Sequence, residues 1–292
     1  MIVQPPVEYP SIGLFSLNEG ASVPPGPLAE VATLAEELGY ESLWMGEHPF
    51  LPDPPGPHSP FSAQLQLVDP VIALTYLAGI TSRIRLATGI LILPLRNPIV
   101  LAKALASLDH LSGGRLTVGI GMGYIEHQAR MFGIDFATRG ARGREHLAAM
   151  RTLWHDAKPE FHGKYVDFHN VDAHPRPVQQ SVPVVAGGHT VPALKLAATQ
   201  CQGWYGFGCT PQAAAELVRQ IEELGARHGR PEHLGPLEIT VTPPRGPVSD
   251  SALRAYAAAG VHRVVTFPQL GLDLAGLIDY VRTHAPARIL AH

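Results

Sequence analysis

Short apolar runs alternate with helical patterns along the whole chain. The first predicted helix carries Leu28, Val31, Ala35 and Leu38 at helical spacing, and Gly39 is placed to end it. Eight runs predict strands, at residues 12–17, 42–45, 85–93, 116–120, 182–186, 204–207, 237–241 and 263–267. Later helices are predicted from about residue 69 and at 99–111, 126–132, 141–155, 193–199, 212–228, 251–259 and 274–284.

This alternation predicts an α/β protein built as one (β/α)₈ TIM barrel. An open, doubly wound sheet also alternates, but it rarely needs eight strand–helix units. Residues 122–181, whose last part (158–181) is irregular, are interpreted as an insertion in a βα connection, because no Gly/Ser linker flanks them. Residues 1–292 are therefore predicted to form a single domain.

The composition and charge of the chain exclude some classes of binding partner. The net charge is −3 and no run of Lys or Arg stands out, so nucleic acid or an anionic membrane is not expected as a partner. Residues 1–9 lack the charged start and apolar core of a signal peptide, and runs such as 86–95 are too short to span a bilayer. The two cysteines, Cys201 and Cys209, are expected to be reduced thiols. We expect a cytoplasmic protein.

The active site of such a barrel lies at the C-terminal ends of its strands. Asn18 and Glu19 follow the first predicted strand, and Arg96 and Asn97 follow the third. Glu47 and His48, after the second strand, are the most informative pair, since a carboxylate beside an imidazole can move a proton near neutral pH. An exposed polar dipeptide is the alternative, and position alone leaves both open.

Two glycine-rich segments lie at later strand ends. Residues 187–190 (Gly-Gly-His-Thr) open a predicted helix, where free N–H groups suit a phosphate, although an ordinary tight turn also uses glycine. Residues 119–123 (Gly-Ile-Gly-Met-Gly) lack the glycine spacing of a dinucleotide fingerprint. We interpret these glycines as backbone that a flat group can approach closely.

Other polar residues point to structure instead of chemistry. His162, His169 and His174 lie in the polar insertion, and the chain lacks a His-Glu-x-x-His motif, so no metal is expected. Residues 109–115 (Asp-His-Leu-Ser-Gly-Gly-Arg) form a turn at the opposite end of the barrel, with Asp109 expected to pair with Arg115.

Several motifs resemble the bacterial luciferase-like superfamily. They are Glu47-His48 after Ser-Leu-Trp-Met-Gly, the run 86–98 (Leu-Ala-Thr-Gly-Ile-Leu-Ile-Leu-Pro-Leu-Arg-Asn-Pro), residues 109–115 and residues 119–124. Later stretches agree, at 161–165, 175–179, 186–188 and 203–204. Within the superfamily the chain is most similar to oxidoreductases that use the deazaflavin coenzyme F420, although neither leading motif decides the coenzyme.

The resemblance implies a role for each matching position. His48 matches the proposed acid/base beside the reacting ring, and Glu47 matches an acidic position that contacts the deazaflavin. Gly89-Ile90 matches a dipeptide that forms a cis non-prolyl bond behind the ring. The remaining matches are a loop beside the coenzyme side chain (Met122, Gly123, Tyr124) and the phosphate loop (Gly188, His189, Thr190).

One residue departs from part of the family. Sugar-phosphate dehydrogenases of this group carry a glutamate where Tyr124 stands, and tyrosine cannot supply the same acid near neutral pH. A sugar-phosphate substrate is therefore not expected.

The leading hypothesis is an F420-dependent oxidoreductase that exchanges a hydride with a small organic substrate, with His48 moving the accompanying proton. The alternative enzyme is a luciferase-like monooxygenase that receives reduced FMN from a separate reductase. A coenzyme-binding protein without catalysis is the third interpretation. The resemblance also implies a homodimer, for which the sequence carries no signal of its own.

Overall fold

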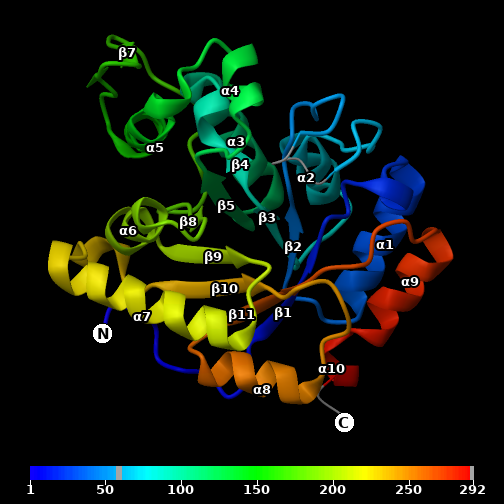
Figure 1. The fold of residues 1–292 in the computed structure, drawn as a ribbon. Coiled ribbons are helices and arrows are strands. Elements are labelled where there is room, and N and C mark those ends of the chain that lie inside the picture. The colour runs from blue at the N-terminus through cyan, green and yellow to red at the C-terminus, as the bar shows by residue number, and fades with distance from the viewer. Residues whose placement is uncertain (57–60, 290–292) are drawn as a thin grey trace.

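Eight parallel strands close into a barrel at the centre of the protein, and helices surround it (Figure 1). The computed structural model describes residues 1–56 and 61–289. Neighbouring strands follow the order β3-β2-β1-β11-β10-β9-β8-β5, and pairing of β3 with β5 closes the barrel. Its strands are β1 (Ser11–Phe15), β2 (Ser42–Met45), β3 (Arg85–Thr88), β5 (Leu116–Gly121), β8 (Val184–Gly187), β9 (Gly203–Phe207), β10 (Glu238–Thr242) and β11 (Arg263–Thr266). The predicted TIM barrel and all eight predicted strands are confirmed.

The predicted helices are also present, with small differences at their ends. Asp69 and Asn97 begin α2 and α3, because each carboxylate or amide oxygen accepts two N–H groups of the first turn. The main helices are α1 (Pro25–Glu37), α2 (Pro70–Ala78), α3 (Pro98–Ser112), α4 (Glu126–Met131), α5 (Arg139–His155), α6 (Val191–Gln200), α7 (Pro211–His228), α8 (Asp250–Ala258), α9 (Leu274–Thr283) and α10 (Pro286–Ile289).

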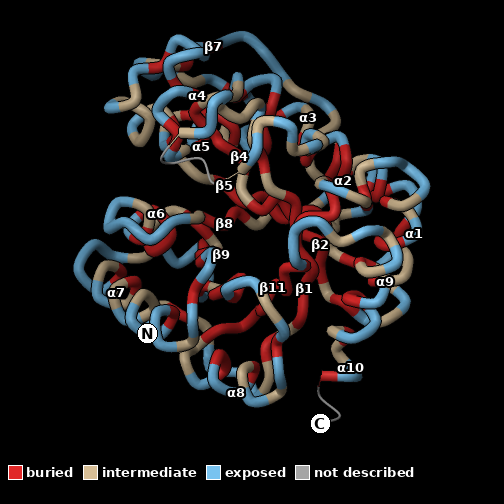
Figure 2. Tube along the Cα trace, turned by 45° about the vertical axis from the view of Figure 1, so that its right-hand side comes forward, coloured by how far each residue is buried: buried red, intermediate tan, exposed pale blue. Residues whose placement is uncertain are grey.

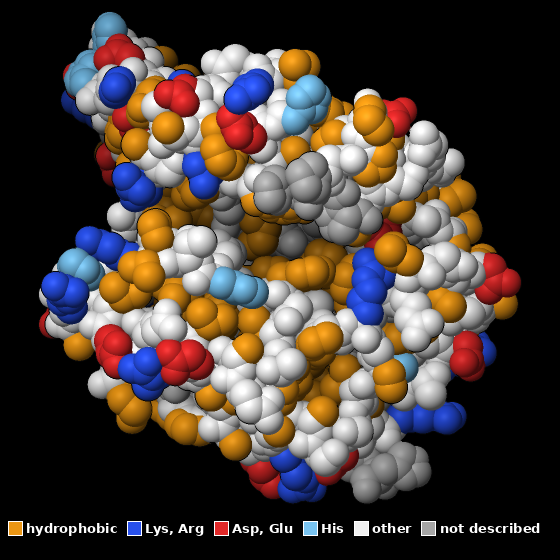
Figure 3. All heavy atoms as spheres, viewed as in Figure 1, with side chains coloured by type: hydrophobic (Ala, Val, Ile, Leu, Met, Phe, Trp, Pro, Cys, Tyr) orange, Lys and Arg blue, Asp and Glu red, His pale blue; other side chains and the backbone are white. Residues whose placement is uncertain are grey.

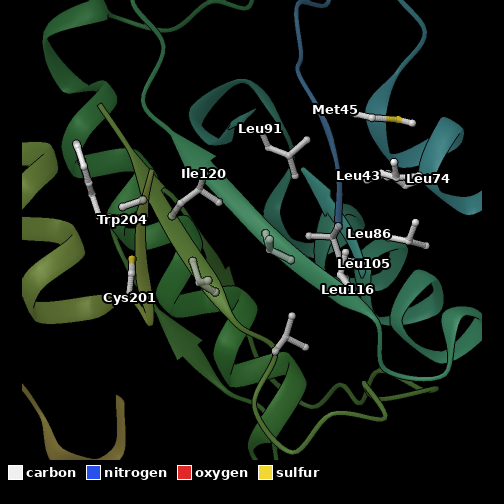
Figure 4. Close-up of a cluster of buried hydrophobic side chains, with 14 of the residues drawn as sticks. Leu43, Met45, Leu74, Leu86, Leu91, Leu105, Leu116, Ile120, Cys201 and Trp204 are labelled. Atoms are coloured by element: carbon white, nitrogen blue, oxygen red, sulfur yellow. The ribbon is translucent and has the colours of Figure 1, made fainter. Parts of the chain in front are cut away.

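Two apolar clusters hold the barrel together, one outside the strands and one inside. The outer cluster joins strands to helices, as Leu43 and Leu86 with Leu74 of α2 and Leu105 of α3 show (Figure 4). The burial of the strands and of the inward helix faces is visible in Figure 2. The inner cluster consists of Phe15, Trp44, Ala87, Val185, Tyr205, Val265 and Phe267. Because these side chains fill the barrel interior, ligand chemistry is confined to its open end.

The predicted strand 85–93 is interrupted, which changes the open end. Pairing stops after Thr88 and resumes in the short strand β4 (Leu91–Ile92), which pairs with the end of β5. Between them, Gly89 N–H donates to the carbonyl of Met45, and the side chain of Ile90 packs into the inner cluster. The apolar pattern could not show this break, because both parts of the run are buried.

The insertion at residues 122–181 contains more order than predicted. It holds α4, α5 and an antiparallel hairpin formed by β6 (Phe161–His162) and β7 (Asp167–Phe168) within the segment predicted to be irregular. In Figure 1 these elements lie together at one side of the barrel.

The expected pairing of Asp109 with Arg115 is wrong. The buried carboxylate of Asp109 accepts the backbone N–H groups of Val178 and Gln179 and the side chain of Gln179. Arg115 instead donates to carbonyl oxygens, including those of Ala78 and Ile84. Each side chain thus satisfies backbone groups of a different neighbouring segment.

No helix within the described ranges is long and apolar enough to cross a membrane.

Candidate active site

Glu47 and His48 lie at the open end of the barrel, directly after β2, as the sequence predicts. A hollow with many hydrophobic side chains along its walls opens in this part of the molecule (Figure 3). The two adjacent side chains have separate sets of partners.

Glu47 is buried and tied to the strand-three segment. One carboxylate oxygen accepts a hydrogen bond from the N–H of Ile92 at 2.5 Å, and the other accepts one from Nε of Arg96 at 2.6 Å. Burial raises the pKa of the Glu47 carboxyl, and the Arg96 guanidinium and the Ile92 N–H offset part of this effect. Both oxygens are engaged by the protein, so Glu47 is placed to anchor the loop that carries His48.

Arg96 extends this anchor to a second loop. Its Nη2 donates to Asp69 at 2.5 Å, and the other oxygen of Asp69 caps α2. The guanidinium therefore connects the loops that follow β2 and β4 with the start of α2. The sequence placed Arg96 at a strand end but gave it no role.

The imidazole of His48 contacts Gln128 and Tyr124 from the insertion. Nδ1 lies 3.2 Å from the Gln128 amide nitrogen, and Nε2 lies 3.4 Å from the Tyr124 hydroxyl. Burial lowers the pKa of His48 below its ordinary value, which favours the neutral ring. Among the described residues, no hydrogen bond joins Glu47 to His48, so the carboxylate does not set the tautomer of the ring directly.

Gln128 fixes which nitrogen of His48 carries the proton. The Gln128 amide nitrogen also donates to the carbonyl of Phe50, which orients the amide group and directs its second N–H at Nδ1 of His48. Nδ1 is then the acceptor, and the proton of the neutral ring resides on Nε2. The sequence did not single out Gln128, which lies in the first turn of α4, shortly after Tyr124.

The glycine pattern of β5 has a different explanation from the one expected. A Cβ on Gly119 would lie 2.0 Å from the carbonyl oxygen of Thr88, and Cβ atoms on Gly121 and Gly187 would each lie 2.7 Å from the side chain of Ile90. The group that approaches this backbone is thus Ile90 of the protein itself.

The expected cis bond between Gly89 and Ile90 is absent. The cis peptide bonds found in residues 1–56 and 61–289 are Asp53–Pro54 and His174–Pro175. A cis bond before a residue other than proline costs about 3 kcal/mol, and the glycines around Ile90 accommodate its side chain with a trans bond. Gly89 and Ile90 nevertheless lie at the open end of the barrel, next to Phe15 and Trp44.

The segment Met122-Gly123-Tyr124 borders the same opening. Gly123 has a φ of +77°, which suits glycine, and a Cβ there would lie 2.8 Å from Ile92. Met122 packs on Gly143 of α5. This packing sets the insertion against the barrel and brings Tyr124 to His48.

Residues 188–190 are exposed at the start of α6. Gly188 has a φ of +114°, and its carbonyl accepts the indole N–H of buried Trp204 at 2.9 Å. His189 lies 3.4 Å from the sulfur of Cys209, a thiol whose pKa burial raises to about 11. The geometry is therefore that of an accessible helix N-terminus, the feature that binds phosphate.

Aromatic side chains line the opening of the barrel at the ends of β1, β9 and β11. Phe15, Phe207 and Phe267 contact one another with ring centres 4.9–5.5 Å apart, and Arg245 lies over Phe267 at 3.7 Å. Glu19 lies nearby in a half-buried setting, where burial raises its carboxyl pKa and Ser16 and Arg245 oppose that shift. These residues come from the ends of β1, β9, β10 and β11.

The described ranges contain no group of three or more His, Cys, Asp or Glu side chains arranged to hold a metal ion. His162 is exposed between Glu160 and Asp167, and His174 is exposed beside Asp172.

Comparison with known proteins identifies a family and relatives of this chain. Residues 11–276 match the family described as luciferase-like monooxygenase. An F420-dependent glucose-6-phosphate dehydrogenase of Kineococcus radiotolerans is 37% identical over 211 residues, which cover 70% of this chain and 58% of the relative.

Two solved structures share the fold across 97% of this chain and 99% of their own. One is an F420-dependent secondary alcohol dehydrogenase in complex with an F420–acetone adduct, with a TM-score of 0.77 and 17% identity. The other is the monooxygenase RslO1 from Streptomyces bottropensis, with a TM-score of 0.74 and 21% identity.

Proposed function

Because the chain belongs to the luciferase-like monooxygenase family, we propose that it is an oxidoreductase that uses coenzyme F420. It would transfer a hydride between the deazaflavin and a small organic substrate. The observation that carries this proposal is the neutral, oriented imidazole of His48 at the open end of the barrel. The 37% identical F420-dependent dehydrogenase supports the choice of coenzyme.

The residues at the open end fit such a coenzyme. Gly188, His189 and Thr190 present an exposed helix N-terminus to its phosphate. Met122, Gly123 and Tyr124 border its side chain, and Gly89 and Ile90 lie where the resemblance puts the ring. When bound, the coenzyme accepts or supplies the hydride, and the protein contributes placement, exclusion of water and control of the proton.

His48 would handle that proton. Oxidation of an alcohol would release a proton from its hydroxyl, and a neutral imidazole is a base that can take it. Nε2 already carries a proton in the tautomer that Gln128 favours, so the lone pair that would take the substrate proton is on Nδ1, once the Gln128 N–H moves away. Glu47 holds the loop through Arg96 and Ile92 instead of exchanging protons itself.

An FMN-dependent monooxygenase is the alternative function. The family description and the shared fold of RslO1 favour it. Oxygen separates the two functions, because deazaflavin lacks the ring nitrogen that makes oxygen activation easy. Turnover that requires oxygen and reduced FMN would support the monooxygenase.

The test is anaerobic oxidation of a panel of secondary alcohols with F420. The rate is measured as the loss of absorbance of the oxidised coenzyme. His48→Ala is expected to lower the rate roughly 100-fold or more while the dissociation constant for F420 stays within twofold. His127→Ala, which removes an exposed histidine of α4, is the matched control and should keep the rate. Full activity of His48→Ala would overturn the assignment of His48, and coenzyme binding without turnover of any substrate would favour a binding protein.

A further inference from the structure

A second hollow lies beside His48. It is a cleft of about 380 Å³, which falls within the roughly 300–1,000 Å³ typical of small-molecule sites. The apolar residues in its wall are Pro49, Leu67, Val68, Pro70, Leu95 and Phe132. His48 lines the cleft as well, so a compound bound there is next to the imidazole.

The charged side chains in the wall of the cleft pair with one another. Glu47 and Asp69 both pair with Arg96, and these three are the acidic and guanidinium side chains of the cleft. Two carboxylates and one guanidinium give the cleft a formal charge of −1. A phosphate or carboxylate group would meet this negative charge with the guanidinium already occupied.

We propose that this cleft binds the substrate and that the substrate is a small, uncharged, mostly apolar alcohol or carbonyl compound. This inference rests on the proposed function and names the substrate class of the same site. The apolar wall supplies the binding energy, and the oxygen of the substrate lies against the His48 ring, which handles the proton. The charge of the cleft adds a physical reason to the expectation, drawn from Tyr124, that sugar phosphates are not substrates.

Phe132 is the residue expected to select the substrate. It follows α4 with 45% of its surface exposed, and its ring lies nearly parallel to that of Phe50, at 4° and 6.2 Å between centres. Phe50 in turn is held by Gln128 through its carbonyl. The position of this aromatic wall is thus coupled to the same amide that orients His48.

The experiment measures binding without any coenzyme. Fluorescence titration compares 2-naphthol, which is neutral at pH 7, with 2-naphthyl phosphate, which has the same rings and a negative charge. The protein is expected to bind 2-naphthol at least tenfold more tightly than the phosphate. Equal or tighter binding of the phosphate would overturn the proposed substrate class.

Two aromatic residues of similar exposure give a matched pair of variants. Phe132→Ser is expected to weaken 2-naphthol binding at least fivefold, and Phe132→Leu to weaken it less. Tyr76→Ser, at a residue of α2 that is 41% exposed and outside the cleft, should leave it within twofold. If Tyr76→Ser weakens binding and Phe132→Ser does not, the cleft is not the site.

A third variant tests the charge. Asp69→Asn keeps an oxygen to cap α2 but removes one negative charge beside Arg96. It is expected to tighten 2-naphthyl phosphate binding at least threefold and to leave 2-naphthol unchanged; no change with the phosphate would contradict the electrostatic argument. Since no coenzyme is present, failure of these tests is distinguishable from failure to bind F420.

Discussion

The carboxylate of Glu47 and the guanidinium of Arg96 form an ion pair in which the Glu47 side chain is only 4% exposed. The N–H of Ile92 satisfies the second carboxylate oxygen. Three loops at the open end of the barrel are thereby fixed to one another, and the residue that follows Glu47 is His48. The placement of His48 thus depends on a pair that does not touch it.

Breaking this pair should destabilise the protein. Arg96→Leu leaves the Glu47 carboxylate buried without its cation, which costs about 3–5 kcal/mol. Urea unfolding followed by circular dichroism measures the loss. Adding Glu47→Gln to Arg96→Leu removes the unpaired charge and should recover part of the stability; a single variant as stable as the wild type would mean that the pair contributes little.

The protonation of His48 should follow the identity of residue 128. Burial lowers the pKa of His48, so its titration by NMR is expected to have a midpoint below pH 6.5. Gln128→Glu places a carboxylate at Nδ1, which favours the imidazolium and should raise the midpoint by roughly one unit or more. Nitrogen chemical shifts should show the proton on Nε2 in the wild type, and a proton on Nδ1 would contradict the assigned tautomer.

The glycines of the barrel interior should differ in how well they tolerate a methyl group. Gly119→Ala places a Cβ against the backbone oxygen of Thr88, which cannot move aside, and should cost about 3 kcal/mol. Gly187→Ala comes within 3 Å of side-chain atoms of Ile90 alone, which can shift, and should cost about 1 kcal/mol. Thermal unfolding of the two variants compares them, and equal losses would show that Ile90 is as constrained as the backbone.

The expected homodimer stays a prediction, and the structure suggests where to test it. Ile72 and Tyr76 on α2 and Val100 and Leu111 on α3 are exposed apolar side chains on two neighbouring helices. If this face joins two copies, Val100→Glu should convert a dimer into a monomer in sedimentation velocity. A wild-type protein that sediments as a monomer would remove the expectation.

The barrel could be predicted because its signal is repeated eight times in local sequence. Apolar runs of strand length and helices with N-capping residues such as Asp69 and Asn97 are determined by neighbours close in the chain. The break between β3 and β4 was not visible, because it arises when Ile90 turns toward glycines of β5 and β8. The turn of Ile90 depends on glycines as distant in the chain as Gly187.

The sequence placed Glu47 and His48 after the second strand, where the structure has them, but it predicted none of their contacts. The contact of His48 with Tyr124 joins two loops that are far apart in the sequence. The partner of His48 is Gln128, however, and the partner of Glu47 is Arg96. Adjacent residues at a strand end point in different directions, so sequence proximity was a poor guide to which side chain would face the imidazole.

Fluorescence titration of the purified protein with F420 and, separately, with FMN tests the proposed coenzyme most directly. We expect tight binding of F420, weak binding of FMN, and loss of F420 affinity when Gly188→Glu places a negative charge at the start of α6. Preference for FMN would contradict the central claim and assign the protein to the oxygen-dependent branch of its family.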